Sequence, residues 1–267
     1  MYAAPLHGLS VDSIDQRTIA DRLSAIERSS GAVTANRVQS SLSALFGWAM
    51  REGRAASNPV ALTNKRQERP RDRVLSDAEL ALIWRALDDG QYGCIVKLLM
   101  LSGQRLTEIT ELRWSEIDFD RDVISLPASR TKNDRPHDVP LAPTMKALLQ
   151  EQPRRGDRDL VFGRRTGAFT GLSGAKRKLD ARVRELNGGK PIPPWVHHDL
   201  RRTAATGMSN IGVQPHVVEA VLNHVSGHKG GVAGIYNRST YAAEKAEALA
   251  RWDAHIAAIA GSHKTAL

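Results

Sequence analysis

The chain has 267 residues, enough for one large domain or for a small domain followed by a larger one. Its hydrophobic share of 41% allows a real core, and its net charge of +9 favours polyanionic partners, nucleic acid above all. The single cysteine, Cys94, excludes an intrachain disulfide and lies in an apolar run typical of a buried structural thiol. The sequence shows neither a signal peptide nor a membrane anchor, so we expect a cytoplasmic protein without a membrane partner.

The first part of the chain is predicted to be helical from about Ser13 to Gly53. Apolar residues recur there at helical spacing, and Thr34 is a plausible cap for a second helix. The two predicted stripes consist of Ile19, Leu23 and Ile26, and of Val38, Leu42, Leu45, Phe46 and Met50. A basic run without apolar residues follows at 64–73, which is typical of a linker. We therefore predict a helical domain over 1–65, a linker over 66–74 and a second domain over 75–267.

The second part begins with a capping box, Ser76 with Glu79, in front of an apolar helical stripe. Further helices are predicted over 93–101, 105–112, from about 144, and over 171–186, 200–208, 215–222 and 240–259. Between them, Val123–Leu126 and His137–Leu141 have the pattern of two strands joined by a polar turn. The predicted fold class is mainly α with a small antiparallel β-sheet (α+β).

Several basic side chains suggest a phosphate site. Arg201 and His198 are three residues apart at a predicted helix start, where free amide groups also attract an anion. Arg105 also lies at a predicted helix start, where it follows the turn-like pair Ser102-Gly103. A guanidinium is a planar fork that matches two phosphate oxygens. Taken singly, most of the 38 lysines and arginines are better explained as solvated surface residues.

Tyr236 is one of four tyrosines and a candidate nucleophile. A free phenol has a pKa of about 10, so it attacks at neutral pH only with help from a base or cations. Taken alone, such a tyrosine is more often a packing residue, and Tyr241 competes for the same role. Metal binding by His197, His198, His224 and His228 is a weaker alternative, because neither cysteines nor an HExxH spacing accompany them.

Five elements in order resemble the tyrosine recombinases, specifically the phage-type and genomic-island integrases, over residues 75–260. Arg105-Leu106-Thr107-Glu108, continued to Leu112-Arg113-Trp114, is similar to the first box of the family, and His198-Asp199-Leu200-Arg201-Arg202-Thr203 is similar to the second. Leu222-Asn223-His224-Val225-Ser226 resembles the Leu-Gly-His-x-Ser element. Lys132 in the predicted turn matches the mobile lysine of the family, and Tyr236 falls where the nucleophile follows.

The resemblance implies a mechanism without ATP, metal or another cofactor. Tyr236 would attack a DNA phosphodiester and form a 3′-phosphotyrosyl link, while Lys132 protonates the departing 5′ oxygen. The phosphate would be held by Arg105, Arg201 and His224. His198 would assist proton transfer at the tyrosine, and Glu108 would support the site.

The resemblance extends to the partners. It implies double-stranded attachment-site DNA, a monomer or weak oligomer alone, a tetramer on DNA, and accessory DNA-bending or excision factors, in a bacterial or phage-encoded, nucleoid-associated protein. Residues 11–65 resemble a helical core-binding domain that is short for the family and has no arm-binding domain before it. The resemblance therefore implies either a reduced recombinase or a fragment. The candidate DNA contacts are Arg37, Lys65, Arg66 and Arg202.

Two departures from the family pattern stand out: Asn223 replaces the usual glycine, and the glycine-rich stretch 227–231 lengthens the gap from His224 to Tyr236. That loop leaves open whether the tyrosine acts in its own subunit or in a neighbour, and it keeps His228 as a rival to His224. We also expect the apolar side of the last helix to pack on its own domain or on a neighbouring protomer. A DNA-binding regulator and a metal-dependent nuclease remain as alternative functions.

Overall fold

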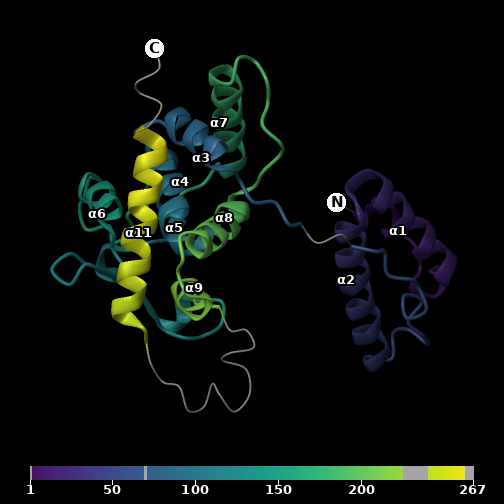
Figure 1. Cartoon of the computed structure of the whole chain (residues 1–267). Helices are drawn as coiled ribbons and strands as arrows, with labels where there is room; N and C mark the ends of the chain where they lie inside the picture. Colours follow the sequence, from purple (N-terminus) through teal and green to yellow (C-terminus); the bar gives the residue numbers. More distant parts are fainter. Residues whose placement is uncertain (1, 69–70, 225–239, 262–267) are drawn as a thin grey trace. The chain divides into compact units, whose positions relative to one another are not determined.

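The computed structural model describes residues 2–68, 71–224 and 240–261. The chain forms two compact units, Met1–Asp72 and Arg73–Leu267 (Figure 1). The candidate site residues predicted after the linker all belong to the second unit, although Tyr236 and His228 lie outside the described residues.

The first unit consists of two short 3-10 turns, η1 (Ala4–Leu6) and η2 (Val11–Ser13), and of two packed helices, α1 (Gln16–Ser30) and α2 (Ala32–Arg51). The predicted stripe of α1 is confirmed, because Ile19, Leu23 and Ile26 are all buried. The prediction that Thr34 caps α2 is wrong. Gly31 precedes the helix with a φ of +84°, a conformation that suits glycine, and α2 starts directly after it.

The predicted stripe of α2 is wrong in part. Leu42 and Phe46 are buried, but Leu45 and Met50 are exposed. The buried face instead includes two polar residues that hold the segment returning after α2. The amide of Asn36 donates to the Arg66 carbonyl at 2.8 Å, and that of Gln39 donates to the Thr63 carbonyl at 2.8 Å. Hydrophobic spacing alone could not find these polar members of the core.

The second unit is mostly helical. Its elements, in chain order, are α3 (Asp77–Ala86), α4 (Gln91–Ser102), α5 (Leu106–Thr110), η3 (Trp114–Glu116), β1 (Ile117–Asp118), β2 (Val123–Leu126), η4 (Ala128–Arg130), β3 (His137–Pro140), α6 (Pro143–Gln150), α7 (Leu172–Leu186), α8 (His197–Asn210), α9 (Pro215–Val221) and α11 (Ala242–Gly261). The capping box of Ser76 and Glu79 is confirmed at the start of α3. The predicted class, helical with a small antiparallel sheet, is also confirmed.

The sheet has the order β1-β2-β3 and is antiparallel throughout. In the β2–β3 pair, Ile124 lies opposite Val139 and Leu126 lies opposite His137. The alternation of β3 turns His137 and Val139 inward and leaves Asp138 exposed. This register places the polar turn that carries Lys132 between β2 and β3.

The core of the second unit surrounds α4, almost all of whose residues are buried. Cys94 is among them, and its burial raises the pKa of the thiol to about 12, as expected for a structural cysteine. Helix α11, drawn in yellow in Figure 1, packs on α3, α9 and β3. The indole of Trp252 in α11 donates to the Met100 carbonyl at 2.9 Å. The apolar side of the last helix therefore packs on its own domain.

Within the described ranges, none of the helices combines the length and the apolar character needed to cross a membrane.

Candidate active site

Arg105 lies at the N-cap of the short helix α5, where Glu108 orients it. The buried carboxylate of Glu108 accepts a hydrogen bond from Arg105 Nη1 at 2.7 Å and another from the Arg105 backbone amide at 2.8 Å. The Glu108 side chain is 1% exposed and that of Arg105 is 21% exposed. Glu108 thus holds Arg105 in place while the Arg105 guanidinium keeps access to solvent, and the supporting role of Glu108 in catalysis stays a prediction.

Arg201 in α8 connects two distant segments of the unit. Its Nη1 donates to the Gly103 carbonyl at 2.9 Å, and its Nη2 donates to the Leu222 carbonyl at 2.5 Å. Those carbonyls stand two residues before Arg105 and two residues before His224. Burial, and secondly the charge of Arg105, lower the pKa of Arg201 to about 10, so it stays protonated at neutral pH.

His198 lies in the first turn of α8, where the helix dipole favours anions. Burial lowers the pKa of His198, and the neighbouring charges of Arg202, Arg201 and Arg105 lower it further. Its imidazole is therefore neutral at neutral pH and able to accept a proton. Arg201, three residues further along α8, binds the Gly103 carbonyl two residues before Arg105, so the three predicted residues belong to one part of the unit.

Arg202, predicted to contact DNA, is on the same helix. Its Nη1 donates to the fully buried carboxylate of Asp199 at 3.0 Å, and the other Asp199 oxygen accepts from the Val196 amide at 2.8 Å. The Arg202 side chain is partly exposed beside His198. Its role in DNA binding stays a prediction.

Lys132 and His224, both exposed, are linked through their neighbours in the chain. The side-chain amide nitrogen (Nδ2) of Asn133 donates to the backbone carbonyl of Asn223 and to Asn223 Oδ1, each at 3.1 Å. The Asn223 amide nitrogen donates back to Asn133 Oδ1 at 3.2 Å. The turn that carries Lys132 is thereby attached beside His224, on the segment that Arg201 also holds.

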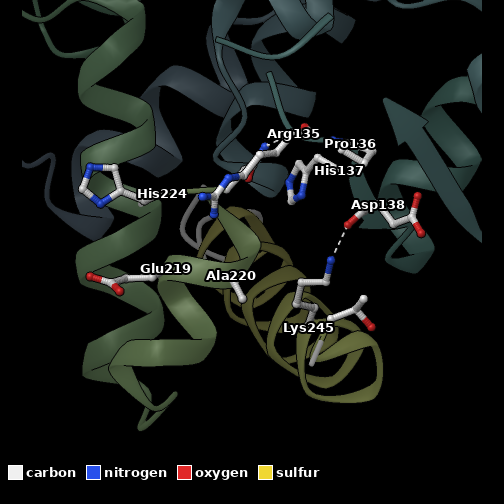
Figure 2. A pocket seen from close by; sticks show the side chains of 10 residues that line it. Arg135, Pro136, His137, Asp138, Glu219, Ala220, His224 and Lys245 are labelled. Carbon is white, nitrogen blue, oxygen red and sulfur yellow. Dashed lines mark hydrogen bonds between the residues drawn. The ribbon is translucent and has the colours of Figure 1, made fainter. Parts of the chain in front are cut away.

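A pocket lies beside this segment, between β3, α9 and the start of α11 (Figure 2). His224 and Glu219 lie on one side of the view, and His137 and Asp138 lie on the other. The ammonium of the buried Lys245 donates to the Asp138 carbonyl at 2.5 Å, and the imidazole Nε2 of His137 donates to the Val221 carbonyl at 3.0 Å. Burial, together with the charges of Lys245 and Arg201, lowers the pKa of His137 to about 4.

The predicted nucleophile, Tyr236, lies outside the described residues. Its rival Tyr241 is described, and its ring packs 5.2 Å from the ring of His216. His197, one of the alternative metal ligands, makes a 2.9 Å hydrogen bond with the hydroxyl of Tyr92. In the part of the chain that the structure describes, no cluster of three or more His, Cys, Asp or Glu side chains is arranged to hold a metal ion.

The DNA-contact candidates of the first unit differ in their surroundings. Arg37 and Lys65 are exposed and line a shallow pocket on α2, together with Asn36, Ser40, Ser41 and Glu68. Arg66 is instead bound within its own unit, where its guanidinium donates to Glu27, Ser24 and the Asn64 carbonyl.

The sequence did not predict roles for Gln104, Asn133 or His137. Each of them binds a backbone carbonyl at the end of α9, a partner without a side-chain signature. Only Asn223 gave a signal, because asparagine directly after a helix is a frequent terminator.

The chain belongs to the phage integrase family. The model described as the phage integrase family matches residues 73–242, and the model described as the phage integrase central domain matches residues 1–66. The first match lies within the second compact unit, and the second match lies within the first unit.

Curated relatives agree with this membership. The chain is 26% identical over 252 residues to prophage integrase IntA of Escherichia coli, a match that covers 91% of the chain and 59% of IntA. It is 26% identical over 232 residues to tyrosine recombinase XerD of Ralstonia nicotianae, covering 81% of the chain and 73% of XerD. The chain thus spans somewhat more than half the length of IntA.

The fold is also that of solved integrases. The crystal structure of a lambda integrase(75–356) dimer bound to a COC′ core site superposes with a TM-score of 0.65 at 22% identity, covering 84% of each chain. A lambda integrase tetramer bound to a Holliday junction gives a TM-score of 0.62 at 21% identity, covering 80% of this chain and 65% of that chain. At this identity the likeness establishes the fold alone.

Proposed function

We propose that this chain is a site-specific DNA recombinase that cleaves and rejoins DNA through a covalent 3′-phosphotyrosyl intermediate, integrating or excising a mobile element. The observation that carries the proposal is the position of Arg201. Its guanidinium binds the carbonyls of Gly103 and Leu222, and so joins the segment of Arg105 to the segment of His224. Family membership supports the same reading.

The proposed reaction assigns one task to each group. The hydroxyl oxygen of Tyr236 attacks the phosphorus, the bond from phosphorus to the 5′ oxygen breaks, and Lys132 gives a proton to that oxygen. His198 takes the proton of the tyrosine, which its lowered pKa permits at neutral pH. Arg105, Arg201 and His224 stabilise the charge on the non-bridging oxygens. The phosphotyrosyl bond conserves the energy of the phosphodiester, so rejoining needs neither ATP nor a metal.

The proposed partner is double-stranded DNA carrying attachment sites. A lambda integrase is known as a dimer on a core site and as a tetramer on a Holliday junction, and we propose the same progression from a monomer or weak oligomer here. Arg37, Lys65 and Arg202 are the proposed contacts to the DNA backbone, whereas Arg66, also expected there from the sequence, is bound within its own unit. Accessory DNA-bending or excision factors and a bacterial, nucleoid-associated setting in the cytoplasm belong to the same proposal.

The test uses a library of nicked duplexes with a randomised centre, labelled at the 5′ end of the cleavable strand. Cleavage next to the nick releases a short 5′-hydroxyl fragment, so religation fails and the labelled strand stays on the protein. We expect a denaturant-resistant adduct in the presence of EDTA with the wild type, and none with Tyr236→Phe. Sequencing the captured strands gives the target site.

The other outcomes identify the alternatives. An adduct that persists in Tyr236→Phe but is lost in Tyr241→Phe would place the nucleophile at Tyr241. Cleavage that EDTA abolishes, without an adduct, would indicate the metal-dependent nuclease. Selective capture of a DNA sequence without any adduct would indicate the DNA-binding regulator.

A further inference from the structure

Helix α9 ends in a motif that needs a left-handed residue, and Asn223 supplies it. The His224 amide donates to the Glu219 carbonyl at 2.9 Å and the Asn223 amide donates to the Ala220 carbonyl at 3.2 Å, which together form a Schellman motif. Asn223 has a φ of +47°, a conformation that glycine and asparagine adopt most readily. Glycine would therefore serve this backbone at least as well, so the backbone alone does not explain the asparagine.

The side chain of Asn223 has its own partner, Asn133. Their side-chain amides form a reciprocal pair of hydrogen bonds at 3.1 and 3.2 Å. The side-chain amide of Asn133 also donates to the backbone carbonyl of Asn223 at 3.1 Å. Both residues are half-buried, which shields these bonds from competing water. The two asparagines are the immediate neighbours of Lys132 and His224.

The pair belongs to a wider arrangement at the end of α9. The carbonyls of three consecutive residues accept hydrogen bonds from side chains of other elements: Val221 from Gln104 and His137, Leu222 from Arg201, and Asn223 from Asn133. Arg201 and the turn that carries Lys132 are thus both hydrogen-bonded to the backbone of residues 221–223. Of these links, the one from Asn133 attaches directly beside Lys132.

The turn of Lys132 is closed on its own side as well. The buried Thr131 hydroxyl donates to the Arg135 carbonyl at 2.7 Å, which closes a small loop around Lys132, Asn133 and Asp134. This bond holds the loop together but attaches it to nothing outside the hairpin. The Asn133–Asn223 pair is what ties the tip of the loop to the end of α9.

We propose that the Asn133–Asn223 pair positions Lys132, by holding its turn against the end of α9 beside Arg201 and His224. The proposal rests on the proposed recombinase function with Lys132 as the general acid. An exposed lysine on a flexible stem protonates the leaving oxygen efficiently only if its backbone is fixed, because proton transfer needs hydrogen-bond reach. In this proposal Asn133 and Asn223 are positioning residues, since they act through the turn that carries Lys132.

The experiment compares two duplexes that carry the same captured target sequence. One has the natural 5′ oxygen at the cleaved bond, and the other has sulfur in its place. The sulfur leaves as a thiolate without needing a proton, since a thiol is far more acidic than an alcohol. A defect in acid catalysis therefore slows the oxygen substrate and spares the sulfur substrate, whereas a defect in folding or DNA binding slows both.

The key variant is Asn223→Gly, which removes the amide and keeps the left-handed backbone. We expect it to cleave the oxygen duplex about tenfold more slowly or worse, and the sulfur duplex within about twofold of the wild type. Asn133→Ala should give the same pattern, and the double variant should lose no more than either single one. Asn187→Ala, which removes a similar amide at the end of α7, is the matched control and should cleave both duplexes normally.

Variants of Lys132 separate the positioning role of the Asn133–Asn223 pair from the proposed recombinase function. Lys132→Ala should show the same oxygen-selective loss, and adding Asn223→Gly to it should cost nothing further. The positioning role would be overturned if Asn223→Gly cleaved the oxygen duplex as fast as the wild type, or if it cleaved both duplexes equally slowly. The recombinase proposal would stand in either case. Failure of the wild type to form any adduct would instead refute the proposed function.

Discussion

Arg105 and Arg201 show how far two residues of the same type can differ in one site. Arg105 binds a side chain, Glu108, three residues away on its own short helix. Arg201 binds backbone carbonyls from two other segments and is buried. A lysine at position 201 could not reach both carbonyls with the geometry of the planar guanidinium. Arg201 is therefore part of the framework of the unit as well as a candidate phosphate ligand.

At residue level, the sequence offered the candidates that lie in motifs but not the side chains that bind backbone carbonyls. Arg105, Glu108, Arg201 and His198 follow from motif spacing, and the structure brings them together. Gln104 and His137 were missed because their partners are carbonyls of α9, and the fold alone decides which carbonyl a side chain meets. The position of Tyr236 stays a prediction, since the residue lies outside the described part.

His137 gives a prediction for the pH dependence of stability. Burial, then Lys245 and Arg201, lower its pKa to about 4 in the folded chain, against about 6.5 when unfolded. Between these values the unfolded state binds the extra proton, so stability is lost as the pH falls from 6.5 towards 4. The shift corresponds to a loss on the order of 3 kcal/mol in the free energy of unfolding.

His137→Gln should remove this component while its amide still donates to the Val221 carbonyl. Urea unfolding of wild type and variant across pH 4–7 measures the difference, which should grow in favour of the variant as the pH falls. The same replacement at the exposed His216 controls for losing an imidazole near this region. Parallel curves for wild type and His137→Gln would contradict the assignment.

At the scale of elements, most helices and both longer strands follow from periodicity and caps. The capping box at Ser76 was found because both of its partners are local in sequence. The start of α2 was misplaced because a glycine with positive φ, and no capping side chain, begins that helix. Its polar core residues Asn36 and Gln39 were missed because their partners lie 24 to 32 residues further on.

Two glycines inside helices allow a matched prediction about the packing of α8. A Cβ on Gly207 in α8 would come within 2.3 Å of the buried ring of Trp252 in α11, whereas a Cβ on Gly174 in α7 would meet nothing within 4 Å. Gly207→Ala should therefore destabilise the unit by about 1–3 kcal/mol, because the ring cannot move aside in a packed core. Gly174→Ala should be neutral or stabilise by up to about 1 kcal/mol, through helix propensity.

Thermal unfolding of the two variants measures this contrast. Equal melting temperatures for Gly207→Ala and Gly174→Ala would mean that α8 and α11 are not packed as described.

The packing of α11 also determines what a C-terminal truncation would do to the protein. Removing 240–267 deletes Lys245, Leu249, Trp252 and Ile256 from the core, so it would destabilise the whole unit as well as any contact between protomers.

At the scale of the whole molecule, the chain divides its proposed work between two units. The second unit holds the described candidates for catalysis, and the first offers exposed cations on α2 and on the segment after it. The net charge of +9 makes salt-dependent DNA binding the expected behaviour of the full chain. Composition alone predicts that dependence, but it does not say which cations contribute.

Among the candidate DNA contacts of the first unit, we expect Arg37 and Lys65 to bind phosphates. They line a shallow pocket with Ser40 and Ser41, whose hydroxyls can also donate to phosphate oxygens, and with Asn36 and Glu68, whose side chains bind each other, whereas Arg66 is bound within the unit. Each phosphate contact contributes about −0.9 to the slope of log K against log salt. Replacing Arg37 and Lys65 by alanine should therefore make the slope shallower by up to about 1.8.

Fluorescence anisotropy with a duplex, titrated over a range of salt concentrations, measures these slopes for the full chain. Arg17→Ala is the control, because it removes one exposed charge from the start of α1, outside the pocket on α2. Its slope should match that of the wild type. If instead the slope changes by the same amount per charge removed in both variants, overall charge and not the pocket on α2 governs binding, and Arg37 and Lys65 lose their assignment as phosphate contacts.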